Sequence, residues 1–255
     1  MYNSIQDTLI IGKKVIYLPS CHSTNDIAAE IVHAGLFTEG TVVITGHQLS
    51  GRGQRGTSWV SNPGENLTLS IVLTPAFLSV QNQFLISQTV ALGIRAYLER
   101  YVSGVQIKWP NDILVKERKI CGILIENAIQ GSRLNTSIVG IGLNINQMSF
   151  NSELASSLFI ETGNVFALAD EFALLMHSLD AAYLQLRSGH RYDEIRQAYM
   201  DSLYGHLQEV KFSYEGNVYT GTVTGVNELG QLSARLSNGD MLTNLGLKEI
   251  SWIRS

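Results

Sequence analysis

The sequence Lys108-Trp109-Pro110-Asn111-Asp112 ends an apolar strand in a polar turn. Pro110 stops the strand because proline has no backbone N–H to donate to a sheet. The turn brings a cation, an amide and an anion together, and such a set can neutralise phosphate, hold Mg²⁺ or orient an incoming amine. An Asx turn that caps a strand, with Trp109 in the core, explains the same residues without any chemistry.

Two segments downstream also carry polar groups beside predicted strands. A polar hairpin turn over residues 116–119 ends in Lys119, and Gly122 in the next strand leaves room for a ligand. A solvated turn lysine is the alternative. In a strand over residues 137–145, Gly140 and Gly142 predict either a bulge or something that approaches the backbone closely. Asn144, which follows them, offers a donor and an acceptor that can read the edge of a base.

Upstream of this stretch, residues 48–59 form a glycine-rich loop that contains Gly51, Arg52, Gly53 and Arg55. Glycines let backbone N–H groups approach a ligand closely. Arginine offers paired donors that suit phosphate or carboxylate. The loop is therefore a candidate anion cradle, although a flexible surface loop with solvated arginines is the alternative when it is considered alone.

Hydrophobic periodicity divides the chain into a large mixed unit and a small all-β unit. Strands are expected at residues 15–18, 41–45, 66–74, 105–109, 113–115, 120–125 and 137–145. Helices are expected from a cap at Thr24 or Asn25 to residue 33 and at 84–101, 164–186 and 193–203, with irregular structure over 146–163. Short alternating strands over residues 208–252 predict an antiparallel barrel of about five strands. We therefore expect domains over residues 1–205 and 206–255.

Composition limits the functional classes. The chain has 255 residues, 45% hydrophobic and 16% charged, with a net charge of −4, which argues against nonspecific nucleic-acid binding. Two distant cysteines, Cys21 and Cys121, suggest free thiols in a reducing compartment rather than a disulfide framework. The first residues lack a signal-peptide pattern, and no apolar run reaches the ~20 residues of a membrane span. A cytoplasmic protein with no membrane partner is expected.

Taken in order, Ser23-Thr24-Asn25, the Gly-Arg-Gly loop, Lys-Trp-Pro-Asn-Asp, Arg-Lys-x-x-Gly and Gly-x-Gly-x-Asn-x-Asn resemble the motifs of biotin protein ligase over nearly the whole chain. The resemblance implies an α+β fold, with a mixed β-sheet flanked by helices, as in class II aminoacyl-tRNA synthetases, and an SH3-like C-terminal β-barrel. It implies ATP-dependent ligation of biotin, through biotinyl-5′-AMP, to a lysine of the biotin carboxyl carrier protein domain of acetyl-CoA carboxylase or a related carboxylase. Biotin, ATP and Mg²⁺ are then required, with Mg²⁺ held mainly by the ATP phosphates.

The resemblance also assigns roles to individual residues. Lys119 is expected to contact the biotin carboxylate and the reacting phosphate, and Lys108 to face the phosphates. Asp112 is expected to help activate the acceptor lysine, and Arg52 to belong to the loop that closes over the ligand. The implied biotin-binding residues are Ser23, Thr24, Asn25, Gln48, Gly51, Arg52, Gly53, Gln54, Lys119, Gly122 and Leu124. The implied ATP-binding residues are Arg52, Arg55, Trp59, Lys108, Asn111, Lys119 and Asn144.

The chain departs from the family pattern at two places. Gln54 and Thr57 stand where many members carry positive charge, which puts retention of the reactive adenylate in doubt. Residues 1–22 are too few for the winged helix-turn-helix domain of some bacterial members, so a monofunctional ligase without DNA binding is expected. Monomer and homodimer both stay open. The alternatives are a lipoate ligase or octanoyltransferase, and a non-catalytic biotin-binding module.

Overall fold

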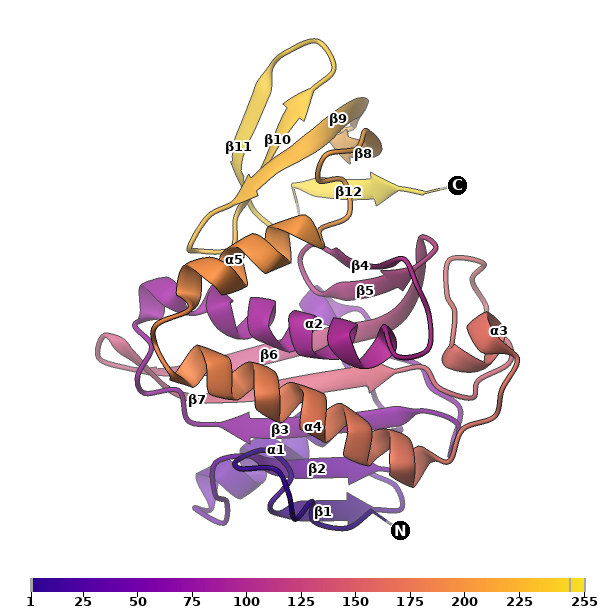
Figure 1. The fold of residues 1–255 in the computed structure, drawn as a ribbon, viewed down its shortest axis with the longest axis vertical. Helices are drawn as coiled ribbons and strands as arrows, with labels where there is room; N and C mark the ends of the chain where they lie inside the picture. Colours follow the sequence, from indigo (N-terminus) through magenta and orange to yellow (C-terminus); the bar gives the residue numbers. More distant parts are fainter. Residues whose placement is uncertain (1, 248, 255) are drawn as a thin grey trace.

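Seven strands form a mixed central sheet in the computed structural model, which describes residues 2–247 and 249–254 (Figure 1). The strand order is β1-β2-β3-β7-β6-β5-β4. β1 and β2 are parallel, and every other neighbouring pair is antiparallel. The strands are β1 (Val15–Leu18), β2 (Thr41–Thr45), β3 (Leu67–Leu73), β4 (Val105–Lys108), β5 (Asp112–Val115), β6 (Arg118–Gln130) and β7 (Arg133–Leu143).

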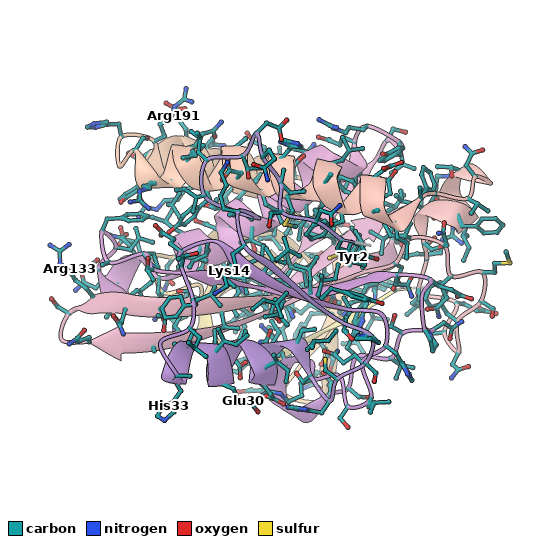
Figure 2. The ribbon with its side chains drawn as sticks, turned by 90° about the horizontal axis from the view of Figure 1, so that it is seen from below. Tyr2, Lys14, Glu30, His33, Arg133 and Arg191 are labelled. Carbon is teal, nitrogen blue, oxygen red and sulfur yellow. The ribbon has the colours of Figure 1, made fainter. Side chains whose placement is uncertain are left out.

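Helices cover both faces of this sheet. Helices α2 (Phe84–Leu98), α4 (Leu168–Arg187) and α5 (Tyr192–Asp201) lie on one face, with the largest hydrophobic core beneath α2 and α4. Helix α1 (Thr24–His33) packs on the opposite face against β2, β3 and β7. Figure 2 shows Glu30 and His33 of α1 on one side of the sheet and Arg191, which precedes α5, on the other. The core under α1 is small, with Ala28, Val43, Val72 and Ile138 as its buried residues.

The start of α1 differs from the prediction in a way that matters for the site. Ser23 occupies the N-cap position, and Thr24 is the first helical residue. The side chains of Thr24 and Asn25 do not cap the helix, because they are bound to Ser70, Gln48 and Glu126 instead. Thr24 and Asn25 therefore turn their polar side chains toward the sheet rather than toward the end of the helix.

The hairpin between β5 and β6 is tighter than expected. The turn is made by Lys116 and Glu117, whose φ angles are 48° and 65°. Arg118 and Lys119 belong to β6 instead, and Lys119 pairs with Leu114 of β5. Lys119 is therefore fixed on a strand rather than carried by a mobile turn.

A five-stranded antiparallel sheet follows, in agreement with the expected number of C-terminal strands. Its order is β11-β10-β9-β8-β12. The strands are β8 (Val210–Tyr214), β9 (Asn217–Val226), β10 (Leu232–Leu236), β11 (Met241–Leu245) and β12 (Ile250–Ile253). Trp109 joins the two sheets, since its Nε1 donates to the Gly230 carbonyl (2.8 Å) and its own carbonyl accepts from Trp252 Nε1 (3.0 Å).

The expectation of irregular structure over residues 146–163 was wrong at its end. A short helix, α3 (Leu158–Thr162), forms there, with Ser157 Oγ accepting from the Ile160 N–H and Gly163 (φ 75°) ending it. Five residues are too few to produce a hydrophobic period, so the cap was the available signal. Two 3₁₀ turns complete the structure, at Gln54–Gly56 and Val80–Asn82. None of the described helices has both the length and the apolarity to cross a bilayer.

Candidate active site

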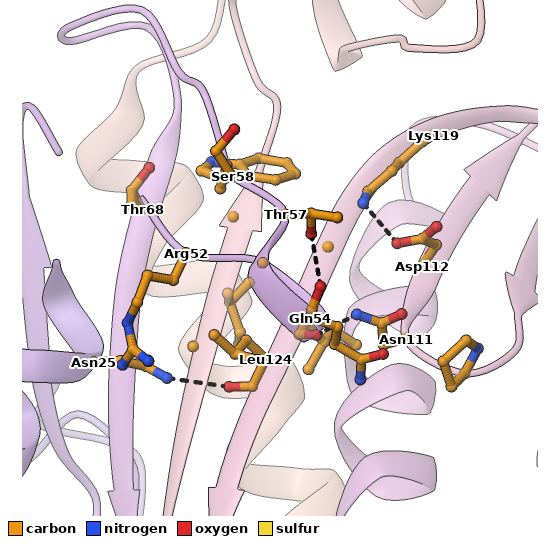
Figure 3. Close-up of a pocket in the computed structure, with 18 of the residues that line it drawn as sticks. Asn25, Arg52, Gln54, Thr57, Ser58, Thr68, Asn111, Asp112, Lys119 and Leu124 are labelled. Carbon is orange, nitrogen blue, oxygen red and sulfur yellow. Dashed lines mark hydrogen bonds and ion pairs between the residues drawn. The ribbon is translucent and has the colours of Figure 1, made fainter. Parts of the chain in front are cut away.

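A cavity of about 630 Å³ opens beside the N-terminus of α1, over strands β3, β7, β6 and β5 (Figure 3). The glycine-rich loop covers one side, and the C-terminal segment contributes Leu247, Ile250 and Ser251. Most of the residues expected from the sequence line it, namely Ser23, Thr24, Asn25, Gln48, Arg52, Gly53, Gln54, Trp59, Asn111, Asp112, Lys119, Gly122 and Leu124. Motifs that are far apart in the sequence thus surround one space.

The α1 end of the cavity is a buried polar floor. Ser23, Thr24 and Asn25 are each at most 3% exposed. The Thr24 N–H donates to Gln48 Oε1 (2.8 Å), which fixes the glutamine beside the helix start. Ser23 Oγ accepts no hydrogen bond from the helix N–H groups, which leaves its hydroxyl for a ligand. The floor therefore offers both donors and acceptors to an uncharged polar group.

Ser70 of β3 holds the orientation of Asn25. Its Oγ lies 2.6 Å from Asn25 Oδ1 and 2.7 Å from Thr24 Oγ1. On the other side, Asn25 Nδ2 donates to Glu126 Oε2 (2.7 Å). A hydroxyl donor on the oxygen and a carboxylate on the nitrogen assign the amide unambiguously.

The two glycines of β7 leave space that other side chains of this protein fill. A Cβ at Gly140 would lie 2.4 Å from Asn25 Oδ1, and one at Gly142 would lie 2.2 Å from Trp59 Cε2. The sequence predicted either a bulge or a close approach at these positions. The structure gives the close approach, and the approaching groups are Asn25 and the indole of Trp59.

Three charged residues meet at the other end of the cavity. Asp112 Oδ1 lies 2.6 Å from Lys119 Nζ, and Asp112 Oδ2 accepts a hydrogen bond from Lys108 Nζ. Burial opposes ionisation of Asp112, but the ammonium groups of Lys119 and Lys108 outweigh it and hold the pKa of Asp112 below its ordinary value. Burial lowers the pKa of Lys108, and the Asp112 carboxylate partly offsets that effect. Asp112 is thus a carboxylate at neutral pH and a weak proton acceptor.

Lys119 reaches the cavity between Asp112 and the loop. Its Nζ lies 5.5 Å from the centre of a Trp59 ring, within cation–π range. A Cβ at Gly122 would lie 3.1 Å from Lys119 Nζ, so the glycine also makes room for this side chain. The Lys119 ammonium is held by a carboxylate on one side and an aromatic face on the other.

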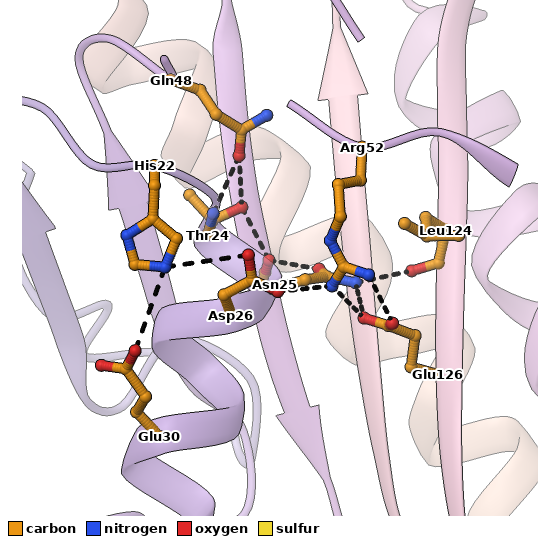
Figure 4. Close-up of polar contacts among 10 residues, drawn as sticks. His22, Thr24, Asn25, Asp26, Glu30, Gln48, Arg52, Leu124 and Glu126 are labelled. Carbon is orange, nitrogen blue, oxygen red and sulfur yellow. Dashed lines mark hydrogen bonds and ion pairs between the residues drawn. The ribbon is translucent and has the colours of Figure 1, made fainter. Parts of the chain in front are cut away.

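Arg52 is bound to carboxylates rather than free over the cavity (Figure 4). Nη1 and Nη2 donate to the two oxygens of Glu126, both at 3.0 Å, and Nη2 also donates to Asp26 Oδ1 at 2.6 Å. The hydrogen bond to Glu126 raises the pKa of Arg52 above its ordinary value, although burial opposes it. Arg52 therefore ties the loop to β6 and to α1.

Three of the expected residues, Lys108, Asn144 and Gly51, do not line the cavity. Lys108 is behind Asp112 with its side chain 12% exposed, because β4 pairs Lys108 directly with Asp112 of β5. Asn144 is buried, donates from Nδ2 to the Ser156 carbonyl (2.9 Å), and keeps Oδ1 without a partner among the described atoms. The Gly51 carbonyl accepts from the Trp59 N–H (2.9 Å), and a Cβ at Gly51 would lie 2.2 Å from the Trp59 carbonyl oxygen. The side chain of Arg55 lies outside the described part of the structure.

The two departures from the family pattern lie together in the loop. Gln54 and Thr57 both line the cavity, and the Gln54 carbonyl accepts from Thr57 Oγ1 at 2.9 Å. Among the described side chains that line the cavity, the cations are Arg52 and Lys119. With Arg52 bound to Glu126 and Asp26, Lys119 is the cation best placed to meet a ligand anion.

Sequence reasoning missed Ser70, Glu126 and Asp26. The alternation of apolar residues over β3 places Ser70 on the face opposite the main core, and that pattern was the available signal for it. Asp26 directly follows the Ser-Thr-Asn motif and Glu126 follows a run of strand residues, but no spacing rule links them to Arg52. Their roles appear only when the register of β6 is known.

Comparisons with known proteins identify relatives of this chain. The bifunctional ligase/repressor BirA of Bacillus subtilis (strain 168) is 28% identical over 250 residues, which cover 95% of this chain and 74% of that protein. A biotin--[acetyl-CoA-carboxylase] ligase of Paracoccus denitrificans is 35% identical over 108 residues, 40% of this chain and 43% of that protein. The structure of biotin protein ligase from Aquifex aeolicus in complex with biotin and ATP superposes with a TM-score of 0.77 at 25% identity, covering 95% of this chain and 100% of that one. Residues 17–144 match the Biotin/lipoate A/B protein ligase family, and because they make up half of the chain, the chain belongs to that family.

Proposed function

We propose that this chain activates biotin with ATP as biotinyl-5′-AMP and transfers the biotinyl group to a lysine of a biotin carboxyl carrier protein domain. The observation that carries the proposal is a single cavity with an uncharged polar floor at one end and the Lys119–Asp112 pair at the other. Biotin has the same polarity, with a ureido ring at one end and a carboxylate at the other. The named activities of the relatives support this choice.

Each end of the cavity suits one part of the substrate. A ureido group needs donors for its carbonyl and acceptors for its two N–H groups, and Ser23, Thr24, Asn25 and Gln48 carry both kinds of atom. The indole of Trp59 gives the middle of the cavity an aromatic wall. A fatty acyl or lipoyl chain has no ureido group to pair with this floor, and its unpaired polar atoms would weaken binding. The floor therefore favours biotin within the family.

The first step joins two anions. A carboxylate oxygen of biotin attacks the α-phosphorus of ATP, the bond from that phosphorus to the leaving oxygen breaks, and pyrophosphate departs. Lys119 lies where it can contact both the carboxylate and the α-phosphate, and its positive charge stabilises the negative charge that gathers there. Lys108 acts from behind by holding Asp112, so that Asp112 in turn holds the Lys119 ammonium in place.

The donor set fits a Mg²⁺ ion that is held mainly by phosphate oxygens. Among residues 2–247 and 249–254, no group of three or more His, Cys, Asp or Glu side chains comes together as a metal site. Asp112, which lines the cavity, has both oxygens occupied by lysines. A bound Mg²⁺ would shield the phosphate charge, and the chain itself contributes the two lysines.

In the second step the neutral amine of the acceptor lysine attacks the carbonyl carbon of the adenylate, the bond from that carbon to the phosphate oxygen breaks so that AMP leaves, and the nitrogen releases its extra proton to solvent. With its pKa lowered by Lys119 and Lys108, Asp112 is better suited to orienting the incoming amine than to taking its proton. Residues 1–205 would supply this chemistry, and residues 206–255 would close the cavity through Leu247, Ile250 and Ser251. The buried free thiols of Cys21 and Cys121 fit a reducing cytoplasm.

The test is to incubate the protein with MgATP and a carrier domain known to be competent, with biotin, lipoate or octanoate in separate reactions. Mass spectrometry of the carrier should show the gain of one biotinyl group in the biotin reaction. A gain with lipoate or octanoate instead would move the chain to the other branch of its family. No gain in any reaction, with biotin binding retained, would indicate a binding module.

A further inference from the structure

Arg52 has few donors left for a ligand in this structure. Its two terminal nitrogens meet Glu126 in the paired geometry that guanidinium and carboxylate groups favour, and Nη2 also meets Asp26. These two carboxylates use three of the guanidinium N–H groups. We call the group of Arg52, Asp26 and Glu126 the Arg52 clamp.

Glu126 also contacts the polar floor. The same Oε2 that accepts from Arg52 accepts from Asn25 Nδ2 at 2.7 Å. Asn25 is bound in turn by Ser70, which is fully buried. A continuous series of hydrogen bonds therefore runs from Ser70 through Asn25 and Glu126 to the loop at Arg52, as Figure 4 shows for the last three.

The clamp is exposed enough to open. The side chains of Arg52, Glu126 and Asp26 are 43%, 40% and 38% exposed, respectively. Ion pairs at such sites are weak and are screened by salt. Weak ion pairs suit a loop that has to open to admit ligands and then close over them.

Resting on the proposed function, we infer that Glu126 is a positioning residue that fastens the loop through Arg52 and orients Asn25 at the floor, with Asp26 as the second anchor of the loop. Glu126 does not line the cavity, so it acts through Asn25 and Arg52, which do. The Glu126 carboxylate binds both the loop, through Arg52, and the side-chain amide of Asn25. The position of the loop and the orientation of this amide therefore depend on one group. Loss of the clamp should free the loop and let the adenylate escape before the acceptor arrives.

Limited trypsin digestion tests the clamp without any ligation chemistry. Trypsin must take the Arg52 side chain into its own pocket to cut the Arg52–Gly53 bond, so the clamp should protect that bond. Glu126→Gln and Asp26→Asn should each speed this cleavage about two- to fivefold, the range that half-exposed ion pairs support. Glu30→Gln is the matched control, because Glu30 is on α1 and near His22 but does not contact Arg52.

Salt gives a second arm of the digestion. Raising the salt concentration should speed cleavage of the wild type and have less effect on Glu126→Gln, whose ion pair is already lost. Equal cleavage rates in the wild type, Glu126→Gln and Asp26→Asn would overturn the inference. Circular dichroism shows whether Glu126→Gln is folded. If it is not, Asp26→Asn still tests the inference, because Asp26 belongs to the Arg52 clamp and not to the polar floor.

Steady-state kinetics then separates positioning from general damage. Glu126→Gln should raise KM for biotin several-fold and release more free biotinyl-AMP per carrier modified, while the rate of pyrophosphate exchange at saturating biotin stays near the wild-type rate. Asp26→Asn should increase release and leave KM unchanged, because the described hydrogen bonds of the Asn25 side chain go to Leu124, Glu126 and Ser70 rather than to the Asp26 carboxylate. Arg52→Ala combined with Glu126→Gln should release no more adenylate than Arg52→Ala alone, since both changes remove the same fastening.

The two proposals fail differently. Absence of carrier labelling by the wild type would defeat the proposed function while the digestion result still decides whether the clamp exists. Normal labelling by the wild type, with additive effects of Arg52→Ala and Glu126→Gln on adenylate release, would defeat the inference alone.

Discussion

The indole of Trp59 lies directly over Gly142, so closely that a Cβ at this position would come within 2.2 Å of Trp59 Cε2. Gly142 lies near the end of β7 and is paired on both sides, with Thr68 of β3 and Gly122 of β6. The strand cannot move aside without losing pairing on both sides. The position of the loop that carries Trp59 is thus set by the absence of a single methyl group.

Gly142→Ala should displace Trp59 and weaken biotin binding, and should cost about 1–3 kcal/mol of unfolding free energy, as overpacked sites do. Urea unfolding and a biotin titration measure the two effects. Gly225→Ala on β9 is the matched control, because a Cβ there meets nothing within 4 Å. Wild-type affinity in Gly142→Ala would show that the indole does not shape the binding space.

Lys119→Ala should lower the rate of adenylate formation by about 10²–10³-fold, the usual effect of removing a group that stabilises developing charge. Pyrophosphate release measures this step directly. Lys211→Ala changes a lysine on the exposed side of β8 and should leave the rate unchanged. Near-normal pyrophosphate release in Lys119→Ala would remove the lysine from the mechanism.

Asp112→Asn should destabilise the protein at neutral pH by about 3–5 kcal/mol, because it leaves the buried ammonium of Lys108 without its carboxylate. The pKa of Asp112 is lower in the folded protein than its ordinary value of 3.8. The carboxylate therefore stabilises the fold above that value, and the stabilisation is lost as the pH falls through the lowered pKa.

Urea unfolding of wild type and Asp112→Asn at neutral pH and at several acidic pH values checks this. The difference between the two should shrink as the pH falls below 3.8. Asp193→Asn, whose side chain is 98% exposed, should stay close to the wild type throughout. A difference that is constant with pH would show that charge is not its cause.

Ser70→Ala should raise KM for biotin with little change in kcat, because Ser70 holds Asn25 and Thr24 but lies outside the reacting end of the cavity. It should also cost about 1–3 kcal/mol of stability, since Asn25 Oδ1 loses a buried donor.

Ser137→Ala is the matched control on the neighbouring strand β7. Ser137 is equally buried, and its Oγ has no hydrogen-bond partner among the described atoms. Its removal leaves no group unpaired, so stability and KM should both stay near the wild type. Parallel effects of the two substitutions on KM would mean that the loss of a buried hydroxyl, and not the Ser70–Asn25 contact, is responsible.

Local sequence patterns predicted the position of each strand of the central sheet, but β6 runs on to Gln130, beyond the expected residue 125, and β7 begins at Arg133 rather than at residue 137. The alternation over residues 66–74 fixed the faces of β3, and Pro110 fixed the end of β4. Most of the side chains that these motifs singled out line one cavity in the structure, because the motifs lie on elements that meet on one face of the sheet.

Contacts that depend on register between distant strands could not be predicted. Gly140 and Gly142 signalled a close approach, but only the pairing of β3, β7 and β6 shows that Asn25 and Trp59 are the groups that approach. Lys108 was expected to face the phosphates, and its pairing with Asp112 places it behind that residue instead. Asp26 and Glu126 met no pattern, because an ion pair leaves no periodic trace in a sequence.

Trp109 directly follows β4 of the central sheet and makes two hydrogen bonds to the C-terminal unit: it donates to the Gly230 carbonyl, and its own carbonyl accepts from Trp252 Nε1. Lys108, which precedes it, is bound to Asp112, which lines the charged end of the cavity. The turn that leads to Asp112 is consequently also in contact with the C-terminal segment. In a chimaera that carries the C-terminal segment of a relative, that segment would have to offer Trp109 the same two hydrogen-bond partners. Without them, the lysines beside the cavity would move in space even though the sequence around them is unchanged.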